Sequence, residues 1–263
     1  MLEEIKEATL KAGKLIIDAE KTYHEITSKE GSGEYVTQWD LAIQNMLKES
    51  LLALCPEAGF LGEEGSETPP ELESGWCFIV DPIDGTSNFI RNYRHSSVSV
   101  ALSFKQEIIF GAVCNPYQNE LFYAEKGKGA FCNGTALGLV RRPLEKSIVI
   151  FGTSNYDRCL ANPTFTLLRS LFDKAEDLRC SGSAALDICY IASGRCDIFF
   201  EYRLCPWDYA AGSLILMESG YIIEAIDGKA PPLTGKSSII AASPFLLDEI
   251  KALGLLSSKG KEI

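Results

Sequence analysis

Apolar residues recur at helical spacing near the start of the chain and predict an amphipathic helix. Glu and Lys side chains separate the apolar positions, which are Leu2, Ile5, Ala8, Ala12, Leu15, Ile16 and Ala19. A second helix is predicted from about Asp40 to Leu54, with Pro56 just beyond its end. Residues 27–38, between the two helices, are polar and contain glycine, so the sequence predicts a loop there.

Short strand patterns fill the middle of the chain, after an acidic, proline-containing linker at 66–75. They are rich in β-branched or aromatic residues and cover 76–80, 98–104, 107–114 and 121–125. This block predicts an antiparallel meander. The segment Gly127–Cys132 resembles a glycine-rich nucleotide loop only superficially, because it lacks the third glycine and follows a strand. A hairpin turn is predicted there instead.

Strands and helices alternate from about residue 146 onward. The predicted strands are 148–151, 196–200, 221–225 and 239–242, and the predicted helices are 163–172, 184–192, 209–217 and 245–253. Such alternation is typical of a sheet covered by helices. We therefore predict an N-terminal α+β subdomain at 1–145 and a C-terminal α/β subdomain at 146–263, joined in one compact unit. The polar tail at 257–263 is expected to fray.

Composition and charge place the chain among ordinary globular proteins. Of its 263 residues, 46% are hydrophobic and 23% are charged, which excludes disordered, collagen-like and coiled-coil proteins. No stretch reaches the roughly 18 apolar residues of a membrane helix, and the charged N-terminus lacks a secretory signal, so we expect a soluble, cytoplasmic protein. The net charge of −11 argues against binding to nucleic acid. It allows a phosphorylated substrate if metal ions reverse the local charge.

Cysteine and histidine usage narrows the possible chemistry. Nine scattered cysteines without a C-x-x-C pair argue against a disulfide framework or a zinc site. Only His24 and His95 are present, and no H-E-x-x-H, G-x-S-x-G or Walker motif occurs. Any catalysis must therefore be carried by carboxylates.

The densest candidate for such chemistry is the segment Asp81–Phe89, which has the sequence Asp-Pro-Ile-Asp-Gly-Thr-Ser-Asn-Phe. Asp81 follows an apolar run and stands at the carboxyl end of a predicted strand. Gly85 permits a tight turn and leaves room for a phosphate to approach backbone N–H groups. Thr86 or Ser87 could cap a short helix. The alternative is an Asx-type turn, in which the aspartates bond their own backbone.

Two other acidic positions adjoin apolar segments. Glu63 and Glu64 follow a short apolar segment that ends at Gly62, and by themselves they fit solvated loop charges. Asp208 follows Trp207 at a predicted helix start, and by itself it fits a helix N-cap.

Together, three of these segments resemble the motifs of the inositol monophosphatase family, whose members are magnesium-dependent, lithium-sensitive phosphatases. The segments are Gly62–Glu64, Asp81–Phe89 and Trp207–Gly212, in the family's order and at similar spacings. The resemblance implies a layered α/β/α/β/α sandwich and a homodimer. Ser87 replaces a threonine often found at its position, and the Ser-Asn-Phe ending looks like the inositol branch of the family.

The resemblance also implies a set of metal ligands. Glu63, Asp81 and the main-chain carbonyl of Ile83 would hold one Mg²⁺. Asp81, Asp84 and Asp208 would hold a second, and a third, weaker ion would use Glu63 and water. Four carboxylates in one pocket need counter-ions to stay ionised, which two Mg²⁺ ions supply. Hard oxygen ligands suit Mg²⁺ and not zinc.

Other residues receive roles from the same resemblance. Thr86, paired with Glu63, would orient the nucleophilic water, Asp40 would lie near that water, and Lys29 would lie on a lid. The substrate would contact Asp84, Gly85, Thr86, Gly182, Ser183, Ala184, Glu201 and Asp208. By itself, Glu201 also fits a solvent-exposed strand end.

The implied activity is magnesium-dependent hydrolysis of small polyol or sugar phosphates, with myo-inositol 1-phosphate as the leading substrate. Alternatives within the superfamily are fructose-1,6-bisphosphatase, histidinol-phosphatase and 3′-phosphoadenosine-5′-phosphate phosphatase. An arginine near the pocket would favour the bisphosphate, and the arginines without a role are Arg91, Arg94, Arg141, Arg142, Arg179, Arg195 and Arg203. The alternative from another class is a non-catalytic, transcription-associated binding role.

Overall fold

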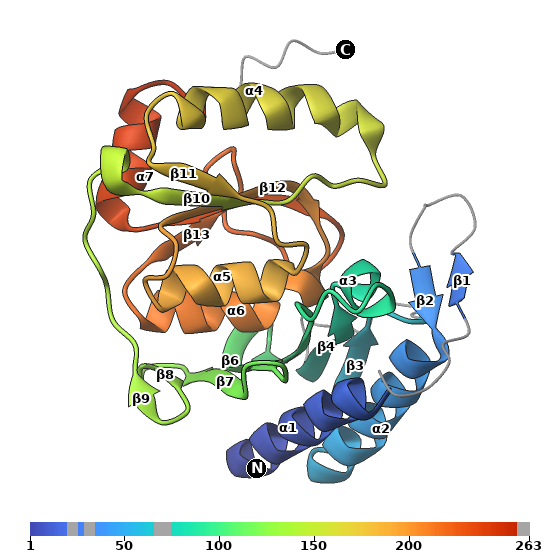
Figure 1. Ribbon diagram of the computed structural model, residues 1–263. Helices are drawn as coiled ribbons and strands as arrows, with labels where there is room; N and C mark the ends of the chain where they lie inside the picture. Colours follow the sequence, from blue (N-terminus) through green and yellow to red (C-terminus); the bar gives the residue numbers. More distant parts are fainter. Residues whose placement is uncertain (20–25, 29–34, 66–74, 257–263) are drawn as a thin grey trace.

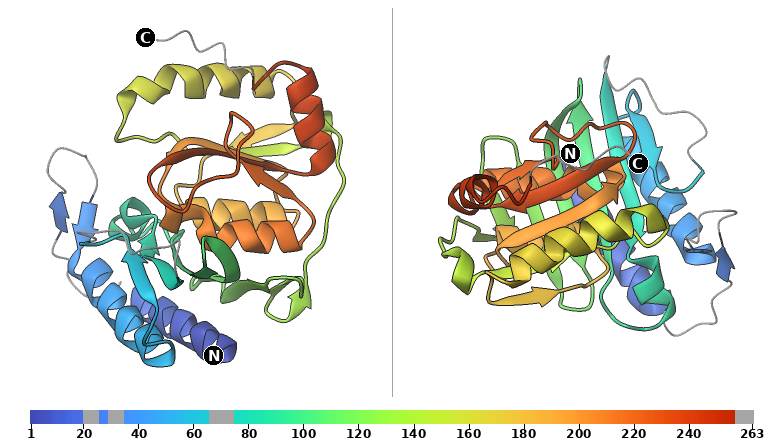
Figure 2. Two further views of the ribbon diagram at one scale, coloured as in Figure 1. Left: turned by 180° about the vertical axis from the view of Figure 1, so that it is seen from behind. Right: turned by 90° about the horizontal axis from the view of Figure 1, so that it is seen from above.

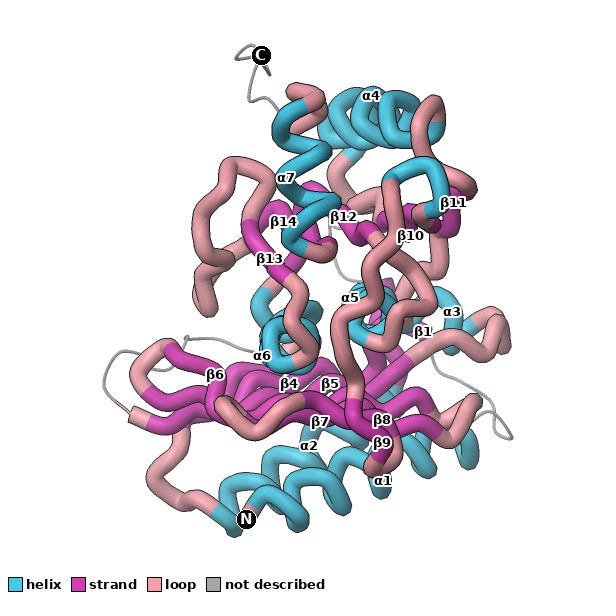
Figure 3. The backbone as a smooth tube through the Cα atoms, turned by 90° about the vertical axis from the view of Figure 1, so that its left-hand side faces the viewer, coloured by secondary structure: helices cyan, strands magenta, loops and turns pink. Residues whose placement is uncertain are grey.

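Two β-sheets alternate with layers of helices, as Figures 1 and 3 show. The computed structural model describes residues 1–19, 26–28, 35–65 and 75–256. Across these residues the layers are helices, a seven-stranded sheet, helices, a five-stranded sheet and helices. The predicted α/β/α/β/α sandwich is therefore confirmed. The division into subdomains at 1–145 and 146–263 stays a prediction.

The first helical layer consists of the two helices predicted from apolar spacing, α1 (Leu2–Ala19) and α2 (Gln38–Leu54). Their apolar faces pack on the seven-stranded sheet in a core that includes Ile5 and Leu47. Thr37 caps α2, because its side chain accepts a hydrogen bond from a backbone N–H of the first turn at 3.1 Å. This cap explains why α2 begins slightly before the predicted start.

The seven-stranded sheet has the strand order β3-β4-β5-β6-β7-β8-β9. Its strands are β3 (Gly59–Gly62), β4 (Trp76–Asp84), β5 (Ser97–Phe104), β6 (Glu107–Asn115), β7 (Glu120–Glu125), β8 (Ala130–Cys132) and β9 (Thr135–Ala136). From β4 onward neighbours are antiparallel, which confirms the meander, and the predicted hairpin joins β7 to β8. β4 continues past its predicted end at Val80, because pairing with β5 resumes at Asp84 after a bulge.

Helices α5 (Ala184–Ala192) and α6 (Pro206–Glu218) lie between the two sheets (Figure 3). They contribute to an apolar core shared with strands of both sheets. α6 approaches β6 so closely that a Cβ on Gly111 would lie 2.5 Å from the carbonyl oxygen of Ala211. The absence of a side chain at Gly111 therefore seats α6, and its first residues, directly on the sheet.

The five-stranded sheet has the order β11-β10-β12-β14-β13, with α4 and α7 on its outer face (Figures 1 and 2). The elements are β10 (Ile148–Phe151), β11 (Asp177–Arg179), β12 (Ile198–Leu204), β13 (Ile222–Glu224), β14 (Ser237–Ala242), α4 (Ala161–Phe172), α7 (Pro244–Ala252) and two short 3-10 helices, η1 (Leu144–Lys146) and η2 (Arg158–Leu160). β10 is parallel to β11 and β12, whereas β14 is antiparallel to β12 and β13. Leu167, Phe200 and Leu247 belong to the core beneath the outer helices.

Several local predictions are wrong. The loop predicted at 27–38 contains strand residues, since β1 (Ile26–Ser28) pairs antiparallel with β2 (Tyr35–Thr37). The patterns do not predict β3 or β11, because β3 contains two glycines, which are uncommon in strands, and β11 has only three residues, two of them charged. The short helix α3 (Thr86–Ile90) has Gly85 as its N-cap and no side-chain cap bond, so neither Thr86 nor Ser87 caps it.

Lys29, most of the linker at 66–75 and the tail at 257–263 lie outside the described residues. Within the part of the chain that is described, no helix combines the length and the apolar character needed to cross a membrane. All nine cysteines lie in the described ranges as free thiols.

Candidate active site

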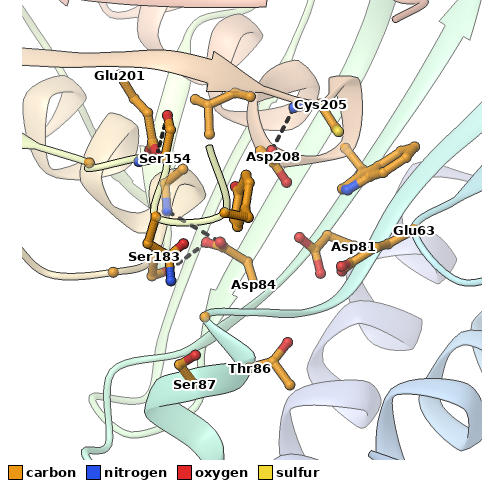
Figure 4. A pocket seen from close by; sticks show the side chains of 18 of the residues that line it. Glu63, Asp81, Asp84, Thr86, Ser87, Ser154, Ser183, Glu201, Cys205 and Asp208 are labelled. Carbon is orange, nitrogen blue, oxygen red and sulfur yellow. Dashed lines mark hydrogen bonds between the residues drawn. The ribbon is translucent and has the colours of Figure 1, made fainter. Parts of the chain in front are cut away.

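A pocket of about 680 Å³ opens where the ends of several elements meet (Figure 4). The residues after β3, the end of β4, the starts of α3, α5 and α6, and the loop after β10 line it. All the predicted site residues line this pocket except two. Asp40 lies behind the wall, within hydrogen-bond distance of Thr86, and Lys29 lies outside the described residues.

The end of β4 brings Asp81 and Asp84 to the pocket (Figure 4). Both side chains are buried, with exposed fractions of 2% and 7%. The backbone N–H of Ile83 donates a hydrogen bond to Oδ1 of Asp81 at 3.0 Å, which is the Asx-type bond of the alternative interpretation. This bond uses one of the two carboxylate oxygens. An Asx turn and a role in the site are therefore compatible at Asp81.

Gly85 turns the chain sharply between β4 and α3. Its φ of +89° lies in the left-handed region, and a Cβ here would be 2.9 Å from the carbonyl oxygen of Gly182. Both conditions favour glycine. The close contact between the two turns brings the start of α5 next to Asp84.

Asp84 is held by donors at the start of α5. Its carboxylate accepts hydrogen bonds from the backbone N–H groups of Ala184 at 3.2 Å and Ala185 at 2.9 Å, and from the hydroxyl of Ser183. Ser97 on β5 donates a further bond at 3.2 Å. Two of the residues expected to contact the substrate, Ser183 and Ala184, therefore bond Asp84 in this structure. Asp84 takes the position that an anion prefers at a helix N-terminus.

Asp208 reaches the same pocket from the first turn of α6 (Figure 4). Its Oδ2 accepts a hydrogen bond from the backbone N–H of Cys205 at 2.7 Å, as in a capping box. The N-cap of α6 is Cys205 and Asp208 is its third residue, so the prediction of Asp208 as the N-cap is wrong, although its side chain accepts a bond from the capping residue and also lines the pocket.

Burial and mutual repulsion make these carboxylates costly to ionise. Burial raises the pKa of Asp81 well above its ordinary value, and the neighbouring charges of Glu63, Asp84 and Asp208 raise that pKa further. Burial is also the main cause of the raised pKa values of Asp84 and Asp208. Bound cations would favour the ionised forms. Groups perturbed in this way are typical of functional sites.

The donor set suits a hard divalent cation, but its geometry is not that of a closed ligand cage. Carboxylate oxygens and a main-chain carbonyl are the ligands that Mg²⁺ prefers. Among the described residues, no three His, Cys, Asp or Glu side chains form a group that could hold a metal ion as they stand. The bonds from α5 to Asp84 and from Cys205 to Asp208 direct carboxylate oxygens toward the protein. Metal binding here therefore requires the carboxylates to approach one another, and because a carboxylate offers about four lone-pair sites, Asp84 and Asp208 can keep their protein donors and still face a cation.

Thr86 and Asp40 connect the pocket to α2. Asp40 is fully buried, and its Oδ2 accepts hydrogen bonds from the N–H and the hydroxyl of Thr37 at 2.7 and 2.6 Å. The Thr86 hydroxyl lies 3.3 Å from Oδ1 of Asp40 and 3.2 Å from the carbonyl oxygen of Ile83. Burial raises the pKa of Asp40 to about 6. The predicted pairing of Thr86 with Glu63 stays a prediction beside these two contacts.

Glu201 on β12 is a buried part of the pocket wall, with an exposed fraction of 8%. Ser154 donates its backbone N–H at 2.9 Å and its hydroxyl at 3.1 Å to Oε1 of Glu201. A Cβ on Gly152 would lie 1.9 Å from Oε2, so the carboxylate packs directly on glycine backbone. Burial raises the pKa of Glu201 to about 7. The alternative of a solvent-exposed strand end is therefore wrong.

The sequence patterns miss several pocket residues, among them Ser154, Asp187 and Lys236. Ser154 has a φ of +44°, which no local pattern predicts. Asp187 is the one charged residue of α5, an otherwise apolar helix, and that exception in the pattern is a usable signal. Lys236 precedes β14 in an exposed loop, where a lysine is unremarkable in sequence.

A sequence model of the inositol monophosphatase family matches residues 1–256. The chain belongs to the inositol monophosphatase family. An inositol-1-monophosphatase of Rhizobium meliloti (strain 1021) is 36% identical over 241 residues, which cover 91% of this chain and 90% of that protein. The Nus factor SuhB of Escherichia coli (strain K12) is 36% identical over 256 residues, which cover 96% and 94%.

The fold agrees with that of a solved relative. The crystal structure of the extragenic suppressor protein suhB from Bartonella henselae has a TM-score of 0.88 at 32% identity, over 98% of both chains. The resemblance inferred from three motifs is thus confirmed over nearly the whole chain. Because an inositol-1-monophosphatase and a Nus factor are about equally similar to it, membership of the inositol monophosphatase family leaves the substrate open.

Proposed function

We propose that the protein is a magnesium-dependent phosphomonoesterase of small polyol or sugar monophosphates, with myo-inositol 1-phosphate as the leading substrate. One observation carries the proposal: Glu63, Asp81, Asp84 and Asp208 come from distant parts of the sequence and line one pocket. Such a pocket repels a phosphate dianion unless cations bind with it. A phosphatase that requires Mg²⁺ is the activity that these residues fit best.

In this proposal the pocket carboxylates hold two Mg²⁺ ions. Glu63, Asp81 and the carbonyl of Ile83 would hold one, Asp81, Asp84 and Asp208 would hold the second, and Glu63 with water would hold a third, weaker ion. When bound, the ions lower the pKa of coordinated water and offset the negative charge of the phosphoryl group.

Thr86 and Asp40 would position the water that attacks phosphorus. The Thr86 hydroxyl can donate its proton to Oδ1 of Asp40, 3.3 Å away, and accept a hydrogen bond from the water. Asp40 is in turn fixed by Thr37 at the start of α2. In-line displacement at phosphorus needs positioning and charge stabilisation more than a protein nucleophile. A chain with only two histidines can therefore still supply the positioning and the charge stabilisation.

Glu201 would bind the hydroxyl groups of the substrate. Ser154 donates to Oε1 of Glu201, so Oε2 is the oxygen that can accept hydrogen bonds from a polyol. Gly152 supplies the space that lets this oxygen approach the backbone. The other proposed substrate contacts are Asp84, Gly85, Thr86, Gly182, Ser183, Ala184 and Asp208.

Lys236 supports fructose 1,6-bisphosphate as a second candidate substrate. It is the one Lys or Arg among the described residues that line the pocket, so it takes the role considered above for an arginine. Its Nζ lies 5.7 Å from the ring centre of Tyr156, another residue of the wall. A lysine at this place can pair with a second phosphate group.

A substrate panel separates the candidates. Phosphate release would be measured with Mg²⁺ and with EDTA, using inositol 1-phosphate, fructose 1,6-bisphosphate, histidinol phosphate and 3′-phosphoadenosine-5′-phosphate. We expect magnesium-dependent release, fastest with inositol 1-phosphate, and a loss of at least about a hundredfold in Asp81→Asn. Asp197→Asn is the matched control, because Asp197 is a buried carboxylate that pairs with Arg142 and does not line the pocket. Undiminished release in EDTA or by Asp81→Asn would overturn the proposal.

The names of the relatives also support a partner-binding role as a second function, since one of them is a Nus factor. Its test is whether a partner captured by wild-type protein is still captured by Asp81→Asn. Retention by that variant would separate binding from hydrolysis. A homodimer in the cytoplasm stays part of the proposal, and the mass in solution checks the dimer.

A further inference from the structure

Asp187 is a buried carboxylate of the pocket that the proposed function does not use. It belongs to the first turn of α5 and has an exposed fraction of 1%. It lies in the same pocket wall as Asp84 and Glu201, whose negative charges act on it. Burying a third carboxylate beside these two costs free energy unless hydrogen bonds compensate for the cost.

The side chain of Asp187 starts a short chain of hydrogen bonds that ends at Asp84. The hydroxyl of Ser181 donates to Oδ1 of Asp187. Because that hydroxyl proton points to Asp187, the Ser181 oxygen can accept from the backbone N–H of Ser183, 3.3 Å away. The hydroxyl of Ser183 in turn donates to Oδ2 of Asp84 (Figure 4). Asp187 therefore helps to fix the donor that holds Asp84.

The turn between Ser181 and Ser183 is fixed from its other side by α3. Asn88 donates through Nδ2 to the carbonyl oxygens of Ser181 and His95, both at 2.8 Å. Gly182, at a φ of +88°, lies so close that a Cβ would be 3.1 Å from Nδ2 of Asn88. Asn88 and Asp187 therefore hold this turn from two sides, beside Asp84.

We propose that Asp187 is a positioning residue, which acts through Ser181 and Ser183 to set the orientation of the Asp84 carboxylate and hence the affinity of the pocket for divalent cations. The inference rests on the proposed function, in which Asp84 is a magnesium ligand. A merely structural Asp187 would affect stability and leave cation affinity unchanged.

Four variants separate the contribution of the hydrogen bond from that of the charge. Asp187→Ala and Ser181→Ala remove the bond between these residues, whereas Asp187→Asn keeps an acceptor oxygen and removes the negative charge. Asp197→Asn alters a buried carboxylate that bonds Arg142 and the N–H of Ile148 outside the pocket. Mn²⁺ binding would be measured by calorimetry. In parallel, the Mg²⁺ concentration for half-maximal activity, kcat and KM would be measured for inositol 1-phosphate.

We expect Asp187→Ala and Ser181→Ala to weaken Mn²⁺ binding and to raise the half-maximal Mg²⁺ concentration about tenfold, with lower kcat and nearly unchanged KM, since one hydrogen bond to a charged network is lost. Asp187→Asn and Asp197→Asn should stay within about twofold of wild type in both cation measurements. If Asp187→Ala does not fold, Ser181→Ala decides.

Two results overturn the proposal. One is wild-type cation affinity in the alanine variants, and the other is an Asp187→Asn variant as defective as Asp187→Ala, which would assign the effect to charge. If the wild-type protein neither binds Mn²⁺ nor releases phosphate, the proposed function fails as well. If it does both and the alanine variants match it, only the role of Asp187 fails.

Discussion

Replacing Glu201 by glutamine should make the stability of the folded protein less dependent on pH. Glu201 is 8% exposed, and burial raises its pKa from 4.5 to about 7, although the bonds from Ser154 oppose that rise. The folded protein therefore binds this proton more tightly than the unfolded chain does. Below pH 4.5 the residue is protonated in both states, and stability is lost as the pH rises through about 7.

The size of this effect follows from the two pKa values. The difference between 4.5 and about 7 corresponds to about 3 kcal/mol in the free energy of unfolding. Glutamine has nearly the same shape and keeps an oxygen that can accept from Ser154, but it carries no charge at any pH. The variant should therefore gain about 3 kcal/mol over wild type between pH 4 and pH 8.

Urea unfolding in EDTA at pH 4, 6 and 8 measures this difference, because EDTA removes cations that would stabilise the ionised form. Other carboxylates titrate in both proteins, so the comparison isolates Glu201. Glu249→Gln is the matched control, because Glu249 is exposed on α7 and the change removes the same charge. Parallel pH profiles for wild type and Glu201→Gln would refute the argument from burial.

Three further predictions test other parts of the site. Asp81→Asn should unfold at a higher temperature than wild type in EDTA, since one of several mutually repelling buried charges is removed. The variant should also lose the stabilisation by Mg²⁺, because a proposed ligand is gone; thermal unfolding in EDTA and in Mg²⁺ checks both results. Gly152→Ala should lose about 1–3 kcal/mol in urea unfolding, because its Cβ would lie 1.9 Å from Oε2 of Glu201, and equal stability would contradict the packing. Lys236→Met should lower kcat/KM for fructose 1,6-bisphosphate about tenfold relative to inositol 1-phosphate; Lys229→Met, at an exposed lysine paired with Asp227, should leave that ratio unchanged.

Much of the layered architecture could be predicted because long amphipathic segments carry their own period. The two N-terminal helices and the meander follow from spacing alone, and α5 has the predicted bounds. Short pairs such as β1 and β2 could not be predicted, because a strand of three residues gains its stability from its partner. Thr86 and Ser87 are residue types that could cap α3, whereas Gly85 provides the turn without a cap bond.

The candidate site was predictable where its residues lie in dense motifs, and hidden where it depends on contacts between distant segments. The motif that contains Asp81 and Asp84 is visible in sequence, but the bond from Ser183 to Asp84 joins residues 99 positions apart. The positive φ of Ser154 and its bonds to Glu201 exist only after β10 and β12 pair. Asp187 is visible in the sequence as the single acid of an apolar helix, whereas its hydrogen bond with Ser181 is not.

Diffraction from crystals grown with Mn²⁺ would test the central claim most directly, because the anomalous signal locates the cations. The account predicts two peaks in the pocket between Glu63, Asp81, Asp84 and Asp208, about 4 Å apart, with Asp84 still bonded to Ser183. Peaks only outside this pocket, or none at millimolar Mn²⁺, would contradict it.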